Sequence, residues 1–471
     1  MMDQQELRAF KKITLIVTLV VSFCSAFIMS AVNVALPVMG EQLGMTSVML
    51  GWVPISSLLV SAVLMVPAGR LGDIYGRNRI FILGLVFQLF STVLCGLATS
   101  GSFVIFTRLL QGVGIATIFG TMAAILTSIF PIDERGKALG ISVAGTYAGL
   151  AFGPFLGGVL TQYLGWRSIF FFGAFVTAVI LGFASSKLKG EQSEAAGEKF
   201  DVIGTLLFVL SLGLIIYGFT ILPGLLGFIL VVIGIILLGA FVRLEGKTKS
   251  PILNVGILGR NAVFVFSNIA TMVQYSASFA LTFLLSLYLQ YIKGCSPQQA
   301  GMILLINPLV MAVFAPIAGR LSDRFQPQII AAVGMSFSCI SMALLSVLDG
   351  KSHLDYIITL LALAGLSAGI FSTPNTNAVM SAVEKRFLGV AAGTQGTTRA
   401  LGMVLSMGIV MILFTVLMGG EKITPQHYQA FLACMKTGFI IFAALSFIGI
   451  FCQLAGRRRE TSQAGNAGIM K

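Results

Sequence analysis

The sequence predicts an all-α polytopic membrane protein, with fourteen spans arranged as two six-helix halves and two inserted helices. Hydrophobic residues make up 57% of the 471 positions and charged residues only 10%, whereas a soluble domain contains about a quarter charged residues. Long apolar runs recur along the whole chain, and a helix needs roughly 20 apolar residues to cross a bilayer. Similar charged segments, which begin at Gly69 and Gly319, indicate an internal repeat.

Each expected span is an apolar run that ends at charged, glycine or proline residues. The fourteen ranges are 13–38, 47–69, 79–99, 102–129, 137–163, 168–187, 202–221, 224–243, 262–291, 298–319, 328–348, 356–377, 388–418 and 432–455. The first run continues to Val38 without a clear small-residue cleavage site, so we interpret it as a retained helix rather than a signal peptide. The ninth and thirteenth runs are long, which predicts tilt or ends outside the membrane.

Lysine and arginine positions predict that both termini are cytoplasmic. Most basic residues lie in alternate connections between spans, for example at Arg70 and Arg77, and cytoplasmic loops are enriched in these residues. The net charge of +13 therefore encodes orientation, and no nucleic-acid partner is expected. The six scattered cysteines and two loop histidines form no metal or disulfide pattern, so no metal or other cofactor is expected.

Two polar connections divide the chain into predicted domains. Residues 1–190 form an N-terminal six-helix half, residues 191–261 an inserted two-helix segment with cytoplasmic connections, and residues 262–471 a C-terminal six-helix half. The second connection contains Pro251 to Leu258, a mildly amphipathic stretch that is either a helix on the membrane surface or a loop. Matching halves around a central pathway are common in secondary carriers, so this organisation favours a transporter.

The repeated charged segment is predicted to be a loop that latches two helix bundles and releases them when they rock. Its glycines permit a tight turn and close helix approach, and Asp73 can pair with a nearby arginine or accept hydrogen bonds from a helix end. A loop that only fixes orientation is the alternative, and the matched spacing in both halves favours the latch. The latch residues of the two copies are Gly69, Asp73, Gly76, Arg77, Gly319 and Asp323.

The fifth span has a small-residue face and an internal proline. Gly145, Gly149, Gly153 and Gly157 recur every four residues and therefore lie on one helix face, which allows close packing against a neighbouring helix. Pro154 removes a backbone hydrogen bond and favours a bend. A bend with a sliding seam is one interpretation and ordinary tight packing is the other, and the two are compatible.

An arginine at membrane depth marks a candidate substrate cavity. Arg108 lies in the fourth span, where a charge is costly unless it faces protein or water and finds acceptors, so we expect it to face the central cavity with Gln111. It would attract anionic substrate groups or steer protons, and the structural alternative is an arginine that bonds carbonyls and the Asn33 amide. Further polar residues within spans are candidates for substrate or interhelical contacts. They are Asn33, Tyr147, Asn268, Gln274, Asn307 and Arg399.

Several of these segments resemble motifs of the major facilitator superfamily. Gly69–Arg79 resembles the signature between spans two and three, Arg108–Gly114 the span-four motif, and Gly145–Gly158 the span-five motif associated with antiporters. Further segments are similar to the start of span six and to motifs of the fourteen-span drug:proton antiporter family. They are Gly165–Phe170, Val32–Pro37, Tyr288–Gln290, Ser296–Gly301 and Arg399–Gly402. The resemblance implies a multidrug-efflux-like antiporter in which the span-five motif biases alternation towards export.

The chain departs from that family at the position of its usual membrane carboxylate. Ile28 stands nine residues before Pro37, where the family usually has an acidic residue, and none of the seventeen acidic residues lies in the middle of a predicted span. A buried carboxylate would titrate near working pH and would pair with cationic drugs, so a strict cationic-drug antiporter is not expected. Asp73, Asp323 and Glu41 are the remaining candidates for proton coupling.

The sequence therefore predicts a cell-membrane carrier that exports hydrophobic or amphipathic small molecules by alternating access. One alternative is a carrier of a neutral or anionic lipid or metabolite without proton antiport, and another is a non-transporting receptor or scaffold. The sequence shows no mid-span acid–base pair, nucleophile constellation or phosphate-binding loop, so an enzyme is not expected. The expected partners are the lipid bilayer and a small amphipathic substrate, with protons as an open alternative.

Overall fold

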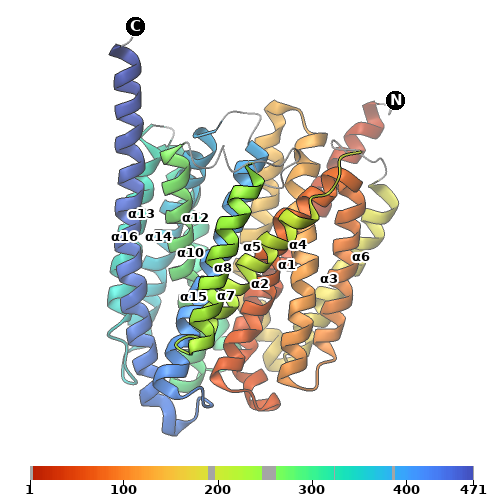
Figure 1. Ribbon diagram of the computed structural model, residues 1–471. Coiled ribbons are helices and arrows are strands. Elements are labelled where there is room, and N and C mark those ends of the chain that lie inside the picture. Colours follow the sequence, from red (N-terminus) through yellow and green to blue (C-terminus); the bar gives the residue numbers. More distant parts are fainter. Residues whose placement is uncertain (1–3, 189–196, 247–260, 323, 384–387, 470–471) are drawn as a thin grey trace. The chain divides into compact units, whose positions relative to one another are not determined.

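The computed structural model describes residues 4–188, 197–246, 261–322, 324–383 and 388–469, and these residues form helices and turns without a strand (Figure 1). Within these ranges, 14 helical segments are long and apolar enough to cross a membrane. The all-α class and the number of spans are therefore confirmed. Helix starts follow local chemistry, because Thr46 and Ser100 accept hydrogen bonds from backbone N–H groups three residues later, as N-cap side chains do.

The helices group into two compact units, each with its own packing. The first unit contains α1 to α6, α7 up to Phe219, α8 and the first residues of α11. The bounds of these helices are α1 Gln4–Leu43, α2 Ser47–Tyr75, α3 Arg77–Gly96, α4 Gly101–Ile129, α5 Ile132–Leu164, α6 Arg167–Lys187, α7 Val202–Thr220, α8 Leu225–Glu245 and α11 Pro297–Leu304.

The second unit contains α10, the end of α11 and the helices that follow. The bounds are α10 Ala262–Leu287, α12 Ile306–Ser322, α13 Pro327–Leu345, α14 Leu354–Ser381, α15 Leu388–Met418 and α16 Tyr428–Ile469. A π-helical turn, Tyr288–Ile292, extends α10, and a 3₁₀ turn, Pro425–His427, precedes α16.

The same helix pairs recur within each unit. In the first unit α1 packs on α5 and α6, while α4 packs on α2 and α3. In the second unit α10 packs on α15 and α16, while α14 packs on α12 and α13. The correspondence makes α12 the counterpart of α2 in the repeat, which matches the spacing of the two charged segments in the sequence.

The prediction of a charged loop after the second span is wrong, because that stretch is almost entirely helical. α2 continues to Tyr75 and α3 begins at Arg77, so Gly76 alone separates them, with a φ of 106°. A positive φ of this kind favours glycine. The motif's first glycine serves the close helix approach that the sequence also indicated, since a Cβ on Gly69 would lie 3.0 Å from the Gly120 carbonyl oxygen of α4.

The tenth predicted span is interrupted. α11 ends at Leu304 and α12 begins at Ile306. Pro308 gives the physical reason, because proline has no N–H for the carbonyl four residues earlier and its ring crowds that carbonyl. The span is therefore two helical pieces rather than the single run expected from hydropathy.

The second copy of the charged segment is helical from Gly319 to Ser322, at the end of α12. Ser322 Oγ accepts a hydrogen bond of 2.7 Å from Asn377 Nδ2 of α14, so this end of α12 is tied to α14. Asp323 lies outside the described residues, as does the stretch from Pro251 to Leu258.

Candidate functional site

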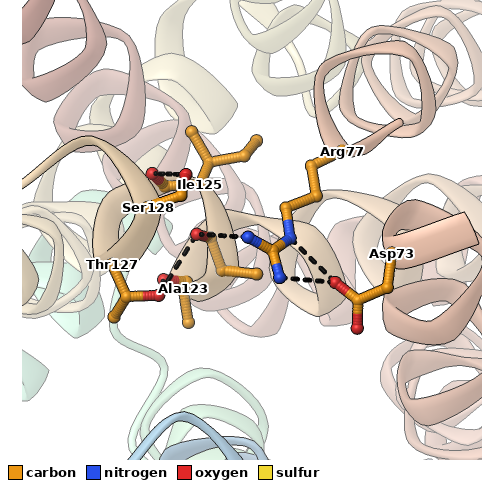
Figure 2. Close-up of polar contacts among 7 residues, drawn as sticks. Asp73, Arg77, Ala123, Ile125, Thr127 and Ser128 are labelled. Atoms are coloured by element: carbon orange, nitrogen blue, oxygen red, sulfur yellow. Dashed lines mark hydrogen bonds and ion pairs between the residues drawn. The ribbon is translucent and has the colours of Figure 1, made fainter. Parts of the chain in front are cut away.

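Asp73 and Arg77 form an ion pair at the junction of α2 and α3. Arg77 Nη2 and Nε lie 2.7 and 2.8 Å from Asp73 Oδ1. Arg77 Nη1 also donates to the Ala124 carbonyl oxygen of α4, 3.4 Å away, and Figure 2 shows the guanidinium between Asp73 and this part of α4. A cation near the carbonyl end of a helix is favourable, so the pair ties α2, α3 and α4 together.

Asp73→Asn is expected to weaken this three-helix junction. The Arg77 side chain is only 9% exposed, and it would keep its charge while losing its carboxylate, at a cost of about 1–3 kcal/mol. Thermal unfolding in detergent and flux in vesicles should both report the loss, and Asp73→Glu should restore part of it.

The matched control is Glu198→Gln. Glu198 Oε2 lies 2.6 Å from Arg70 Nη2, and the Glu198 side chain is 45% exposed. Exposed pairs contribute about 1 kcal/mol or less, so this variant should unfold close to the wild-type temperature. Equal shifts in the two variants would contradict a specific role of Asp73.

The four span-five glycines all face α1. A Cβ on Gly149 would meet the Phe23 carbonyl oxygen and would lie 2.9 Å from Ala26 Cβ. The other three glycines make equally close contacts with α1 along the same face. They are Gly145, Gly153 and Gly157. The predicted small-residue face is thus a backbone-to-backbone seam between α5 and α1.

Ser30 compensates for the proline in this seam. Pro154 has no N–H, so the Leu150 carbonyl lacks its helical donor. Ser30 Oγ of α1 donates to that carbonyl oxygen at 3.1 Å, and α5 runs through Pro154 as one helix. Carbonyls freed by proline inside a membrane are commonly satisfied by a neighbouring serine or threonine.

A double-mutant cycle tests this compensation. Ser30→Ala should destabilise the wild type by about 0.6 kcal/mol, the average for hydrogen bonds between membrane helices, and by no more than about 1.7 kcal/mol. The same substitution should cost much less in a Pro154→Ala background, because the alanine N–H would restore the helical donor to the Leu150 carbonyl. Unfolding in detergent measures both costs, and additive effects would refute the coupling.

The start of α11 packs on another face of α5. A Cβ on Gly158 would meet the Pro297 carbonyl oxygen, and a Cβ on Gly301 would meet that of Pro154. The Ser296–Gly301 motif and the span-five motif are therefore in direct contact within the first unit.

Arg108 lies in a buried polar network of three helices. The residue is 1% exposed, and its Nε donates to the Val53 carbonyl oxygen of α2 at 3.1 Å. Its Nη1 donates to Gln111 Oε1, and Gln111 Nε2 donates to Thr92 Oγ1 of α3 at 2.7 Å. Arg108 Nη2 has no hydrogen-bond partner among the described residues. The carbonyl contact agrees with the structural interpretation of Arg108, while one of its donors is left for a further acceptor.

Acidic residues lie near the ends of the described membrane segments. Glu41 and Asp73 are two residues from the ends of α1 and α2, Glu245 ends α8, and Asp355 is the second residue of α14. Glu460 follows the apolar part of α16, which ends at Ala455. Within the part of the chain that the structure describes, no carboxylate therefore lies in the middle of a membrane helix.

The other candidate residues are dispersed over both units. Asn268 and Gln274 are buried on α10, where Gln274 Nε2 lies 3.3 Å from Ser367 Oγ of α14. Arg399 lies over the Tyr275 ring, with 5.1 Å between the guanidinium carbon and the ring centroid. The remaining candidates are Asn33, which is buried on α1, and the half-buried Tyr147 on α5 and Asn307 on α12.

Ser30 and Thr92 were not identified from the sequence, although a sequence pattern pointed to each of them. An orphaned carbonyl at a membrane proline requires a donor from a neighbour, which directs attention to hydroxyls such as Ser30. Thr92 belongs to a polar stripe on α3 with Gln88 and Cys95, and such a stripe in an apolar run indicates a helix face that contacts protein.

The sequence of the chain matches one large family over most of its length. Residues 18–407 match the family described as the Major Facilitator Superfamily, and residues 267–469 match it again. The chain belongs to the Major Facilitator Superfamily. The riboflavin transporter RibZ of Clostridioides difficile is 30% identical, over 93% of this chain and 96% of its own. The methylenomycin A resistance protein of Bacillus subtilis is also 30% identical, over 87% and 89%.

Solved structures agree with this member of the Major Facilitator Superfamily in fold. A bacterial homologue of the human lysosomal transporter Spinster, in an inward-facing and unoccupied conformation, covers 97% of this chain and 98% of its own. Its TM-score is 0.66 at 17% identity. The expected family is thus confirmed, and this facilitator is a multi-pass transporter of the bacterial cell membrane.

Proposed function

We propose that this facilitator exports neutral or anionic amphipathic small molecules, including flavin-like aromatic heterocycles, by alternating access. The observation that carries the proposal is Arg108, a cation that is 1% exposed and has an unpartnered Nη2 among the described residues. A buried charge is costly without a hydrogen-bonded partner. A carbonyl or carboxylate oxygen of the transported molecule would complete its set of acceptors.

Cationic substrates fit this arrangement poorly. A buried carboxylate would pair with a cationic drug, but the acidic residues of the described membrane helices lie near their ends. Arg108 would repel a cation at the same depth. RibZ, a relative at 30% identity, is named for riboflavin, an uncharged ring system with carbonyl acceptors, which supports a flavin as the first probe.

Uptake into proteoliposomes that contain the purified protein in the inverted orientation tests the proposal. These proteoliposomes should take up riboflavin faster than empty liposomes do, and should take up methyl viologen, an aromatic dication, no faster than empty liposomes do. The substrate preference is the decisive readout, because it follows from the sign of the buried charge. Transport of methyl viologen in preference to riboflavin would overturn the proposed substrate class.

Proton coupling is tested in the same vesicles. Because no carboxylate lies mid-helix among the described spans, we propose that a pH gradient is not required for riboflavin flux. Collapsing an imposed gradient with an ionophore should then leave the initial rate unchanged. A rate that falls with the gradient would instead assign proton antiport, and Glu41 and Asp73 would be the first residues to substitute.

A further inference from the structure

Four buried carboxamides lie on three helices of the second unit. Asn268 and Gln274 lie on α10, Asn375 on α14 and Gln453 on α16, and each is at most 7% exposed. Buried amides are costly unless both the carbonyl and the NH₂ group are bonded. The proposed function leaves these side chains without a role.

A chain of hydrogen bonds runs in one direction through this cluster. Thr271 Oγ1 donates to the Ser267 carbonyl oxygen at 2.9 Å, which uses its single proton. Thr271 Oγ1 therefore accepts from Asn375 Nδ2, 2.7 Å away. Asn375 Oδ1 accepts in turn from Gln453 Nε2 at 2.5 Å. The chain ends at Gln453 Oε1, which has no hydrogen-bond partner among the described residues.

Two more buried amide oxygens have no hydrogen-bond partner among the described residues. Asn268 Nδ2 is engaged with the Phe264 carbonyl oxygen at 2.8 Å, and its Oδ1 has no hydrogen-bond partner among the described residues. Gln274 Oε1 also lacks a hydrogen-bond partner among the described residues. Asn268 and Gln274 lie three residues either side of Thr271 on α10, and Gln453 joins the chain that starts there. All three oxygens are acceptors, so the missing partner is a hydrogen-bond donor.

We infer that Asn268, Gln274 and Gln453, here termed the acceptor cluster, bind the hydroxyl groups of a neutral, polyhydroxylated part of the transported molecule. The inference rests on the proposed function and names the polar portion of its substrate. An organic cation would lack a carboxylate to pair with in this cluster, whereas hydroxyl groups match uncharged carbonyl oxygens.

Two related flavins separate the contribution of the hydroxyl groups to binding from that of the ring system. Riboflavin and lumiflavin share the ring system, but lumiflavin has a methyl group in place of the polyhydroxyl chain. Quenching of flavin fluorescence by purified wild-type protein should show tighter binding of riboflavin. Gln453→Met should weaken riboflavin binding about 5- to 20-fold, the size of one or two neutral hydrogen bonds, and should leave lumiflavin binding unchanged.

Gln395→Met is the matched control. Gln395 is a buried amide of α15, 4% exposed, whose Nε2 donates to Thr376 Oγ1 at 3.2 Å. This variant should preserve the preference for riboflavin. Gln274→Met removes a second cluster oxygen without touching the Thr271–Asn375–Gln453 chain, and it should repeat the selective loss if the Gln453 variant does not fold.

The outcomes separate the two proposals. Equal weakening of both flavins, unchanged riboflavin binding in the variants, or a wild type that does not prefer riboflavin would each overturn the inferred hydroxyl site. Selective binding in detergent without flux in vesicles would leave the acceptor cluster standing and overturn the proposed export function alone.

Discussion

Gly149→Val is expected to abolish most transport and to destabilise the protein. The new Cβ would meet the Phe23 carbonyl oxygen of α1 and would lie 2.9 Å from both Ala26 Cβ and Phe27 N. These are largely backbone atoms that cannot rotate away, so α5 and α1 must separate. Overpacking of this kind costs about 1–3 kcal/mol per site, and the loss of close contact along the seam adds to it.

Gly140→Val provides the control on the same helix. Gly140 is exposed, and a Cβ there has no atom within 4 Å. Both variants introduce the same β-branched residue into α5, so their difference isolates the seam. Riboflavin flux and unfolding temperature should fall for Gly149→Val and stay near wild type for Gly140→Val. A Gly149→Val protein with normal flux would show that the seam tolerates separation.

The seam was predictable from the sequence because periodicity encodes a face. Gly145, Gly149, Gly153 and Gly157 are four residues apart, and this spacing alone places them on one side of a helix. The number of spans was predictable for a similar reason, since the bilayer thickness fixes the length of an apolar run. In both cases the local sequence pattern was sufficient to predict the structure.

Features that depend on a neighbouring helix were not predictable. The sequence indicated that the motif's glycines permit close helix approach, but it did not identify Gly120 of α4 as the partner of the helical Gly69. Arg108 was expected to need acceptors, but the sequence did not identify Val53 and Thr92, which belong to its network because α2 and α3 pack on α4. The sequence indicated which group needs a partner, and the tertiary structure supplies the partner.

Substituting Arg108 is expected to change which molecules are transported. Arg108→Gln removes the buried charge and keeps an amide donor, and Arg108→Lys keeps the charge but not the planar array of donors. One unit charge at about 8 Å, with an effective dielectric constant of about 20, imposes roughly 2 kcal/mol on each positive charge of a substrate. Arg108→Gln should therefore admit methyl viologen, while Arg108→Lys should still exclude it.

Riboflavin flux gives the complementary measurement. Both variants should lower riboflavin flux by about tenfold or more. Neither side chain provides all three donors of Arg108, which are Nε bonded to Val53, Nη1 bonded to Gln111 and the unpartnered Nη2. Each lost hydrogen bond to a charged group costs about 1.5–3 kcal/mol. The contrast between the variants separates charge from hydrogen bonding, since misfolding would depress the flux of every substrate. If both variants exclude methyl viologen and lose riboflavin flux equally, Arg108 is a structural residue and the charge of the substrate is selected elsewhere.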